Sequence, residues 1–418
     1  MFNSCQIKPI LISLSPNVQR DDLWLALKLL FQPWKWKDGN SIKKLEERFS
    51  DYLDLEYSFS FNSGRSAFLA VLKGLDLESG KEVLLQGFTC NAAVNPVLEA
   101  NLNPIFVDVD DSLNMDPSDL KKKISKKSKV VVVQHTFGKP ADLKEIKKIC
   151  ERHNLILIED CAHSLEAEFQ GKKVGTFGKA AFFSLGRDKV ISSVYGGVAV
   201  TDDPVLGERI KKYYNNLNQP GSYWIFQQLM HPILTSFAKP LYGISKLGRY
   251  LLAAFQKIGL LSKSVASEEK KGQLPSIFPS LLPNALAHLG LNQFEKLEEF
   301  NSHREVIADF YNKNLTEVEA DFPASDSNRI FMRYSLLVEK DTNQLLEEAE
   351  EVGIFLNDGW RQSPIVPADT DLSQMNYAWG VCPKAEQTAE KIINLPTHPN
   401  ISLSKARRIV NFLNKKLS

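Results

Sequence analysis

The chain has 418 residues, of which 43% are hydrophobic and 24% are charged, and its formal net charge is +1. This composition is typical of a globular protein with a sizeable core, and the balanced charge argues against nucleic acid as a partner. Five scattered cysteines without metal-ligand spacing, and an N-terminus without a signal-peptide pattern, argue against disulfides, a metal site and secretion. The sequence contains no run of about 18 apolar residues, so no membrane-spanning helix is predicted. We expect a cytoplasmic protein.

Short β-rich segments alternate with helical segments in the first half of the chain. Helices are predicted first at residues 21–31 and 41–53. Strands are then predicted at residues 82–86, 104–108, 129–134, 155–159, 180–184 and 198–201. The helices predicted between them are residues 91–100, 117–125 and 141–152. The middle strands are nearly continuous Val, Ile and Leu, as in parallel strands buried on both faces, so we expect an α/β domain.

The second half of the chain loses this alternation. Residues 204–300 are helical and irregular, and residues 295–315 form one long amphipathic pattern. A strand is predicted at 334–338, followed by helices at 342–351, 384–393 and 404–414. We therefore divide the chain into a large α/β domain, residues 1–278, and a small C-terminal α+β domain, residues 279–418. The lysine-rich run at 121–129 is interpreted as the solvated face of a crossover helix.

A turn of small residues enters a predicted helix at Gly64, Arg65 and Ser66. The N-terminus of a helix offers free backbone N–H groups and the positive end of the helix dipole, which suits a phosphate. A capped helix without a ligand has the same pattern, so this segment leaves both interpretations open.

Asp160 ends an apolar strand, and His163 follows three residues later. In an α/β sheet, ligands bind at the carboxyl ends of the strands. An Asp at that edge can pair with a pyridinium nitrogen and keep it protonated, which makes the ring an electron sink. An acidic strand end beside a loop histidine is the alternative.

Ser184 ends another predicted strand, and Lys189 follows five residues later. The serine hydroxyl is able to hold phosphate. A lysine amine in a desolvated, cationic pocket has a lowered pKa and forms imines readily. A surface lysine near a strand end is the alternative interpretation.

Taken together, these segments resemble the DegT/StrS-type sugar aminotransferases, which are fold type I pyridoxal-phosphate (PLP) enzymes. The shared segments are NSGRSA (62–67), IFVDVD (105–110), HTFGKPAD (135–142), EDCAHS (159–164), GKKVGTFG (171–178), FSLGRDK (183–189) and NLPTHP (394–399). The match covers residues 35–210 well and residues 280–418 more loosely. It implies a large domain with a mixed, mostly parallel sheet.

The resemblance also implies roles for individual residues. Lys189 is expected to be the Schiff-base lysine of pyridoxal 5'-phosphate and the base that moves the proton. Asp160 is expected to bind the pyridine nitrogen, and His163 to lie close to the ring oxygen.

The phosphate is expected to contact Ser184 together with Gly64, Arg65 and Ser66. The loop of Phe88 and Cys90 lies where the family places an aromatic residue against the ring, and either residue is a candidate. The sequence departs from the family at Arg65, where Thr is common, at Val190, where Asn is usual, and across residues 215–285, which match poorly.

Residues 209–267 contain eight Lys and Arg but no Asp or Glu. Bulky apolar residues, such as Trp224, Phe237 and Tyr250, are mixed with these cations at helical spacing. This pattern is typical of a helix that lies in a membrane interface, which would place the enzyme near the membrane. Alternatively, the apolar residues pack in a dimer interface or over the active site.

The implied reaction is transfer of an amino group, with glutamate as the expected donor, to a keto sugar. The sugar is expected to be nucleotide-linked and destined for surface polysaccharide, and two chains are expected to share each active site in a homodimer. Two alternatives stay open: a PLP-dependent sugar dehydratase, and a non-catalytic, membrane-associated scaffold that kept the fold. The presence of Lys189 argues against the dehydratase, and the presence of Lys189, Asp160 and Ser184 together argues against the scaffold.

Overall fold

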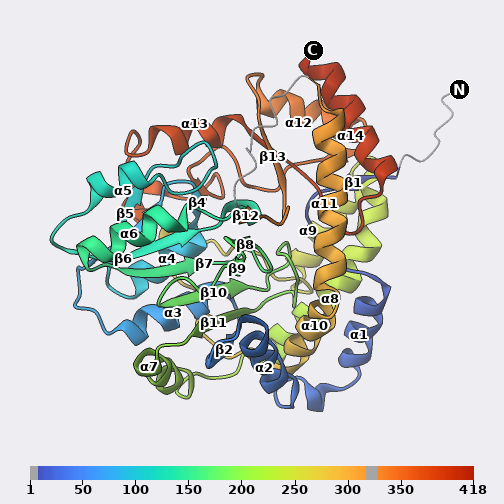
Figure 1. Ribbon diagram of the computed structural model, residues 1–418. Coiled ribbons are helices and arrows are strands. Elements are labelled where there is room, and N and C mark those ends of the chain that lie inside the picture. Colours follow the sequence, from blue (N-terminus) through green and yellow to red (C-terminus); the bar gives the residue numbers. More distant parts are fainter. Residues whose placement is uncertain (1–7, 317–326) are drawn as a thin grey trace, which may run out of the picture.

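The computed structural model describes residues 8–316 and 327–418 and is built around one central sheet (Figure 1). Its seven strands lie in the order β2-β11-β10-β7-β6-β3-β5. Their bounds are Tyr57–Phe61 (β2), Glu82–Gln86 (β3), Asn103–Val107 (β5), Ser128–Gln134 (β6), Ile156–Asp160 (β7), Ala180–Ser184 (β10) and Gly197–Thr201 (β11). Only β11 runs antiparallel to its two neighbours among these strands. The predicted α/β fold with a mixed, mostly parallel sheet is confirmed.

Helices cover both faces of this sheet, so that β3 and β11 are buried along their whole length (Figure 1). The helices of this part are α1 (Arg20–Leu30), α2 (Ser41–Leu53), α3 (Gly64–Leu75), α4 (Asn91–Glu99), α5 (Pro117–Lys123), α6 (Leu143–His153) and α7 (Pro204–Tyr214). The strands and helices predicted between residues 21 and 201 are present, with boundaries that differ by at most two residues. β2 was not predicted, because its alternating Tyr, Ser and Phe differ from the continuous aliphatic runs of the middle strands.

The carboxyl half adds helices and short strands around the central sheet. The helices are α10 (Asn284–Phe294), α11 (Leu297–Asn314), α12 (Thr342–Glu351), α13 (Pro383–Lys391) and α14 (Leu403–Leu417). β13 (Tyr334–Leu337) pairs antiparallel with β16 (Ile392–Leu395). The other short strands are β1 (Ile10–Leu11), β4 (Thr89–Cys90), β8 (Glu168–Phe169), β9 (Lys172–Lys173), β12 (Ser327–Asn328), β14 (Ile354–Phe355) and β15 (Ile365–Val366). β1 pairs with β14, so the amino-terminal end of the described chain lies against the carboxyl half.

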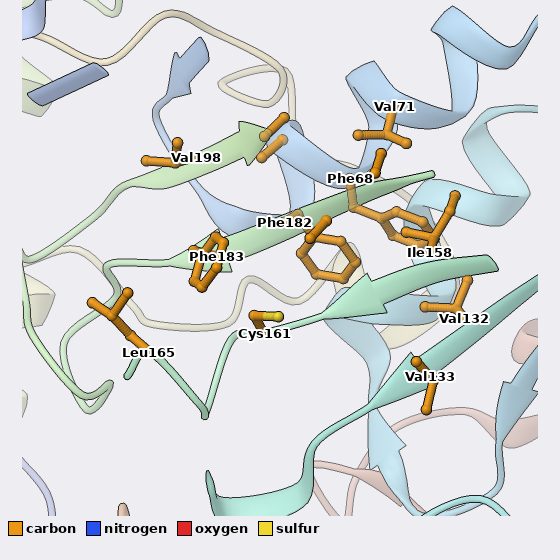
Figure 2. Packing of buried hydrophobic residues seen from close by; sticks show 14 of the residues in the cluster. Phe68, Val71, Val132, Val133, Ile158, Cys161, Leu165, Phe182, Phe183 and Val198 are labelled. Carbon is orange, nitrogen blue, oxygen red and sulfur yellow. The ribbon is translucent and has the colours of Figure 1, made fainter. Parts of the chain in front are cut away.

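The main hydrophobic core lies between the central sheet and its helices. Figure 2 shows part of it, where Phe68 of α3 stacks on Phe182 of β10 with ring centroids 4.6 Å apart. A second cluster joins β13, β16, α12 and α14 and includes Ile10 from the amino-terminal strand. Helix α10 contributes to the main core, although it lies beyond residue 278. The division at residues 278 and 279 therefore stays a prediction.

The acid-free segment 209–267 is mainly helical. After the end of α7 it contains α8 (Ser222–Ala238), a 3₁₀ turn (Lys239–Gly243) and α9 (Leu247–Lys257). Helix α8 packs against α1 and α9, and Leu234 and Leu252 belong to a small core of their own. In the described residues, no helix is long and apolar enough to cross a membrane.

Candidate functional site

A cavity of about 220 Å³ opens at the carboxyl ends of β7 and β10. Seven of the residues singled out in the sequence border it: Gly64, Arg65, Cys90, Asp160, His163, Ser184 and Lys189. They come from four separate segments, which the strands of the central sheet and the start of α3 bring together. This is the sheet edge at which α/β proteins bind ligands.

Lys189 lies in the loop after β10 and borders the cavity. The loop is held from behind, since the side-chain amide of Asn17 donates to the carbonyl oxygens of Lys189 and Val190, at 2.7 and 3.0 Å. Burial lowers the pKa of the Lys189 amine, while the charges of Asp160 and Asp188 act in the opposite direction. Within residues 8–316 and 327–418, no hydrogen bond or ion pair engages this amine. The amine is therefore available to a bound molecule.

Asp160 is the last residue of β7, and its side chain borders the same cavity. One carboxylate oxygen accepts a 2.9 Å hydrogen bond from the backbone N–H of Ala162. Burial raises the pKa of this carboxyl group, and the positive charge of Lys189 partly opposes that rise. The second oxygen has no hydrogen-bond partner among the described residues, so it is available to a donor in the cavity.

His163 is buried between aromatic rings. Its ring stacks on Phe137 at 5.5 Å and meets Trp360 edge-on at 4.9 Å. Burial, reinforced by the charge of Lys189, holds its pKa well below the usual value. Nδ1 accepts a hydrogen bond from the backbone N–H of Phe137 at 3.4 Å. A neutral ring with this acceptor carries its proton on Nε2, which makes Nε2–H a donor.

The start of α3 lies against the end of β10. Ser63 caps the helix by accepting the backbone N–H of Ser66, and a side chain at Gly64 would place Cβ 2.9 Å from the Ser184 Cβ. A Cβ at Gly197 would lie 2.3 Å from the backbone of Ser63. These glycines let the helix N-terminus approach Ser184 closely, which gathers N–H groups and a hydroxyl at one end of the cavity.

Two predicted residues do not border the cavity. The hydroxyl of Ser66 is hydrogen-bonded at 2.8 Å to both Asn62 and Ser63, beneath the helix start. Phe88 is fully buried and packs edge-on against Phe137 and Trp360. We therefore leave Ser66 and Phe88 out of the proposed set of cofactor contacts.

The loop after β3 instead presents Thr89 and Cys90 to the cavity. The hydroxyl of Thr89 donates to Gln134 at 2.7 Å, and both side chains border the cavity. β15 pairs parallel with β4, which brings the nearby Trp360 from the carboxyl half to the same wall. Trp360 was missed because it lies in an irregular segment whose position depends on this long-range pairing.

Arg65, one of the departures from the family pattern, forms a buried ion pair with Glu269. Its guanidinium also lies over the ring of Phe278, 4.7 Å from the centroid. The backbone carbonyl of Glu269 accepts hydrogen bonds from Asn91 and Asn95. The ion pair attaches the segment after the acid-free region to the start of α3, and the two hydrogen bonds attach it to α4.

The end of the acid-free segment covers the cavity. Arg187 donates to the carbonyl oxygen and hydroxyl of Ser262, at 3.0 and 2.7 Å. The Tyr195 hydroxyl donates to the carbonyls of Lys263 and Ser264, and Ser264 and Val265 border the cavity. Residues 264 and 265, at the end of the acid-free segment, therefore form part of the cavity wall.

A buried cluster of His135, Glu159 and Cys161 has metal-ligand residue types. Its carboxylate already accepts the backbone N–H groups of Gly175, Phe177 and Gly178, and His135 lies 3.2 Å away. The other nitrogen of His135 accepts the backbone N–H of Ala141. These contacts already engage the Glu159 carboxylate and both ring nitrogens of His135, and they tie the loop of residues 175–178 to the end of β7.

Comparisons with known proteins agree with this arrangement. A model of the DegT/DnrJ/EryC1/StrS aminotransferase family matches residues 20–230 and 254–414. The GDP-perosamine synthase of Escherichia coli O157:H7 is 26% identical over 385 residues, which are 91% of this chain and 92% of that protein. The L-glutamine:2-deoxy-scyllo-inosose aminotransferase of Streptomyces kanamyceticus is 38% identical over 170 residues, 40% of each chain.

Solved structures show the same fold. Helicobacter pylori PseC, an aminotransferase involved in the biosynthesis of pseudoaminic acid, has a TM-score of 0.73 at 20% identity, over 98% of this chain and 99% of that chain. The PLP form of Spr1654 from Streptococcus pneumoniae has a TM-score of 0.74 at 19% identity, over 98% and 100% of the two chains. The predicted fold type I and the family resemblance are confirmed: the chain belongs to the DegT/DnrJ/EryC1/StrS family of PLP-dependent sugar aminotransferases.

Proposed function

We propose that this protein binds pyridoxal 5'-phosphate in the cavity around Lys189 and transfers an amino group from L-glutamate to a nucleotide-linked keto sugar. The observation that carries the proposal is one shared cavity with two unsatisfied groups. The Lys189 amine and one oxygen of Asp160 both border it without a hydrogen-bond partner in the described chain.

The residues around the cavity fit the three reactive parts of PLP. The aldehyde requires an amine, which Lys189 supplies. The pyridine nitrogen requires a carboxylate, which Asp160 supplies, and the phosphate requires N–H and hydroxyl donors, which the start of α3 and Ser184 supply. When bound, PLP supplies an electron sink that stabilises negative charge on the carbon next to the amino group.

Lys189 is the group that moves the proton. Burial lowers the pKa of its amine, so a larger fraction is neutral near pH 7 than for an exposed lysine. A neutral Nζ is able to accept the proton of the substrate carbon that carries the amino group. The resulting Nζ ammonium is then able to donate this proton again later in the transfer. The hydrogen bonds of Asn17 to the backbone of Lys189 and Val190 keep this loop in place during the transfer.

Asp160 and His163 orient the ring that this cavity would hold. A carboxylate with one free oxygen favours a protonated ring nitrogen. The Nε2–H of His163 is a neutral donor, suited to the ring oxygen. Trp360 and Val265 supply apolar surface at the cavity wall and exclude water from it.

The substrate class rests on the relatives. The name of the GDP-perosamine synthase reported above indicates a nucleotide-linked sugar. Another relative, at 23% identity, is a spore coat polysaccharide biosynthesis protein of Bacillus subtilis. We therefore propose a product used for surface polysaccharide. A relative named for L-glutamine makes glutamine the second candidate donor. The presence of Lys189 disfavours the dehydratase alternative, and membership of an aminotransferase family disfavours the scaffold.

The proposal is tested by the visible absorbance of the purified protein with PLP, before and after each amino donor. We expect a lysine-bound cofactor band that L-glutamate converts to the pyridoxamine form, with L-glutamine measured in parallel. Conversion by glutamine alone would correct the donor. A band that neither donor changes would refute amino transfer from these donors, and absence of the band would refute the role of Lys189.

A further inference from the structure

A second cavity, of about 500 Å³, lies apart from the one that contains Lys189. Its lining residues come from the amino-terminal segment, from the turn that joins α8 to α9, and from the residues before and at the start of α14. The proposed aminotransferase reaction uses none of its lining residues.

Three lysines line this second cavity, namely Lys8, Lys239 and Lys405, and none of its lining residues is acidic. The amine of Lys239 donates to the carbonyl of Ser15 at 2.9 Å, and the amine of Lys405 donates to the carbonyl of Asn400 at 2.8 Å. These carbonyls satisfy hydrogen-bond donors without neutralising charge. The three cations therefore face one space whose lining contains no carboxylate, and, among the described residues, Asp188 is the only acidic side chain that acts on one of them, Lys239, from outside that lining, which suits a bound anion.

Electrostatics supports this reading of the three-lysine cavity. Burial lowers the pKa of Lys239 to about 8, with the charge of Lys405 adding to the effect and Asp188 opposing it. Burial likewise lowers the pKa of Lys405, and Lys8 and Arg408 add to that effect. The lysines repel one another across the cavity, and an anion between them would relieve this repulsion.

Exposed apolar residues adjoin the cavity on the acid-free segment. Ile244 lines it and is itself exposed, and Phe237 of α8 is 69% exposed beside the lining residue Ser236. Helix α9 follows directly, with Tyr250 at 68% and Ile258 at 65% exposure. Leu247, Tyr250 and Ile258 lie along one stripe at helical spacing, whereas Leu252 faces the core.

Cations flank this stripe on α9. Arg249 and Lys257 are exposed, and among the residues described neither forms an ion pair. An apolar stripe flanked by cations, beside a cavity with three lysines, is complementary to a layer of anionic lipid. If a second copy of the chain bound this face in a twofold contact, the same cations would lie on both sides of the interface and would repel one another.

We propose that the α8–α9 region docks on an anionic phospholipid surface, with a lipid phosphate in the three-lysine cavity and Phe237, Ile244 and Tyr250 in the interface. This inference does not depend on the amino donor or the sugar. It would keep the enzyme beside a membrane through residues that do not line the cavity of Lys189.

The test is co-sedimentation of the full-length protein with phosphatidylcholine vesicles, with and without phosphatidylglycerol. We expect binding only to the anionic vesicles and weaker binding at high salt. Each lysine near an anionic leaflet contributes about fivefold to partitioning, so Lys8→Ala with Lys405→Ala should weaken binding about 25-fold. Lys239→Ala is made separately, with its fold checked by circular dichroism, because this side chain is largely buried.

Two matched controls separate the site from general effects. Lys121→Ala with Lys122→Ala removes the same charge from the exposed run on α5 and should leave binding within about twofold, because these lysines lie elsewhere. Tyr250→Ser should weaken binding, whereas Leu337→Ser removes an exposed apolar side chain on β13 and should not.

Four outcomes would overturn the proposal. The first is absence of binding to anionic vesicles. The second is equal loss of binding in the α5 control, which would indicate net charge alone. The third is a change from dimer to monomer on Tyr250→Ser without vesicle binding, which would assign the face to a second copy. The fourth is binding of inorganic phosphate in the cavity by a protein that does not bind vesicles, which would assign the cavity to a free anion.

Discussion

The side-chain amide of Asn17 donates a 2.7 Å hydrogen bond to the backbone carbonyl of Lys189, although 172 residues separate them. The same amide reaches Val190, and Arg304 donates both to Asn17 and to the Val190 carbonyl. An amino-terminal residue and a residue of α11 therefore fix the loop of the catalytic candidate from its buried side.

Asn17→Ala is predicted to lower the free energy of unfolding by about 2 kcal/mol, because the Lys189 carbonyl loses its donor and the buried Arg304 guanidinium loses one acceptor, although Arg304 still donates to the Val190 carbonyl. We also expect a lower kcat, since the Lys189 loop loses support. Urea unfolding and steady-state kinetics measure both. Asn216→Ala, on an exposed turn, is the control, and equal loss in the two variants would contradict the proposed support.

Arg65→Thr introduces the residue that is common in the family. It leaves the buried carboxylate of Glu269 unpaired, so we expect a loss of about 3–5 kcal/mol of stability. Adding Glu269→Gln should restore much of it, because the uncompensated charge disappears. Denaturant unfolding of the wild type, both single variants and the double variant gives the coupling. Strictly additive losses would mean that the pair is not coupled.

Gly64→Ala is predicted to destabilise the protein by about 1–3 kcal/mol and to weaken PLP binding, because the added Cβ would meet Ser184 at 2.9 Å. Gly290→Ala in α10 is the matched control, since its Cβ would have its nearest contact at 3.4 Å. That change should be neutral or slightly stabilising. Thermal unfolding and PLP titration measure both variants, and unchanged PLP affinity in Gly64→Ala would argue against the α3 phosphate site.

The rate of PLP capture by the apoprotein is predicted to rise with pH through the pKa of Lys189. Only the neutral amine reacts, and burial lowers its pKa, so the midpoint should lie below that of an exposed lysine. Asp160 raises this pKa, so Asp160→Asn should move the midpoint to lower pH. Stopped-flow absorbance gives the profile. A midpoint that Asp160→Asn moves upward would contradict the proposed proximity.

Much of the fold was predictable from local patterns, because aliphatic strands alternate with capped helices between residues 82 and 201. The cavity residues Asp160, Ser184 and Lys189 were predictable because each sits at or just after a strand end. Trp360 and Glu269 were not, since their positions depend on β15–β4 pairing and on a buried ion pair. The sequence left Phe88 and Cys90 as alternatives, because a local motif does not tell which side chain turns into the core; Phe88 does so, and Cys90 borders the cavity.

The central claim is that Lys189 holds the cofactor. The most direct measurement is borohydride reduction of the protein with PLP, followed by mass spectrometry of its peptides. We predict a phosphopyridoxyl group on the peptide that contains Lys189, and none on that peptide in Lys189→Ala. A label on another lysine, or no label in a folded protein that binds PLP, would contradict the account.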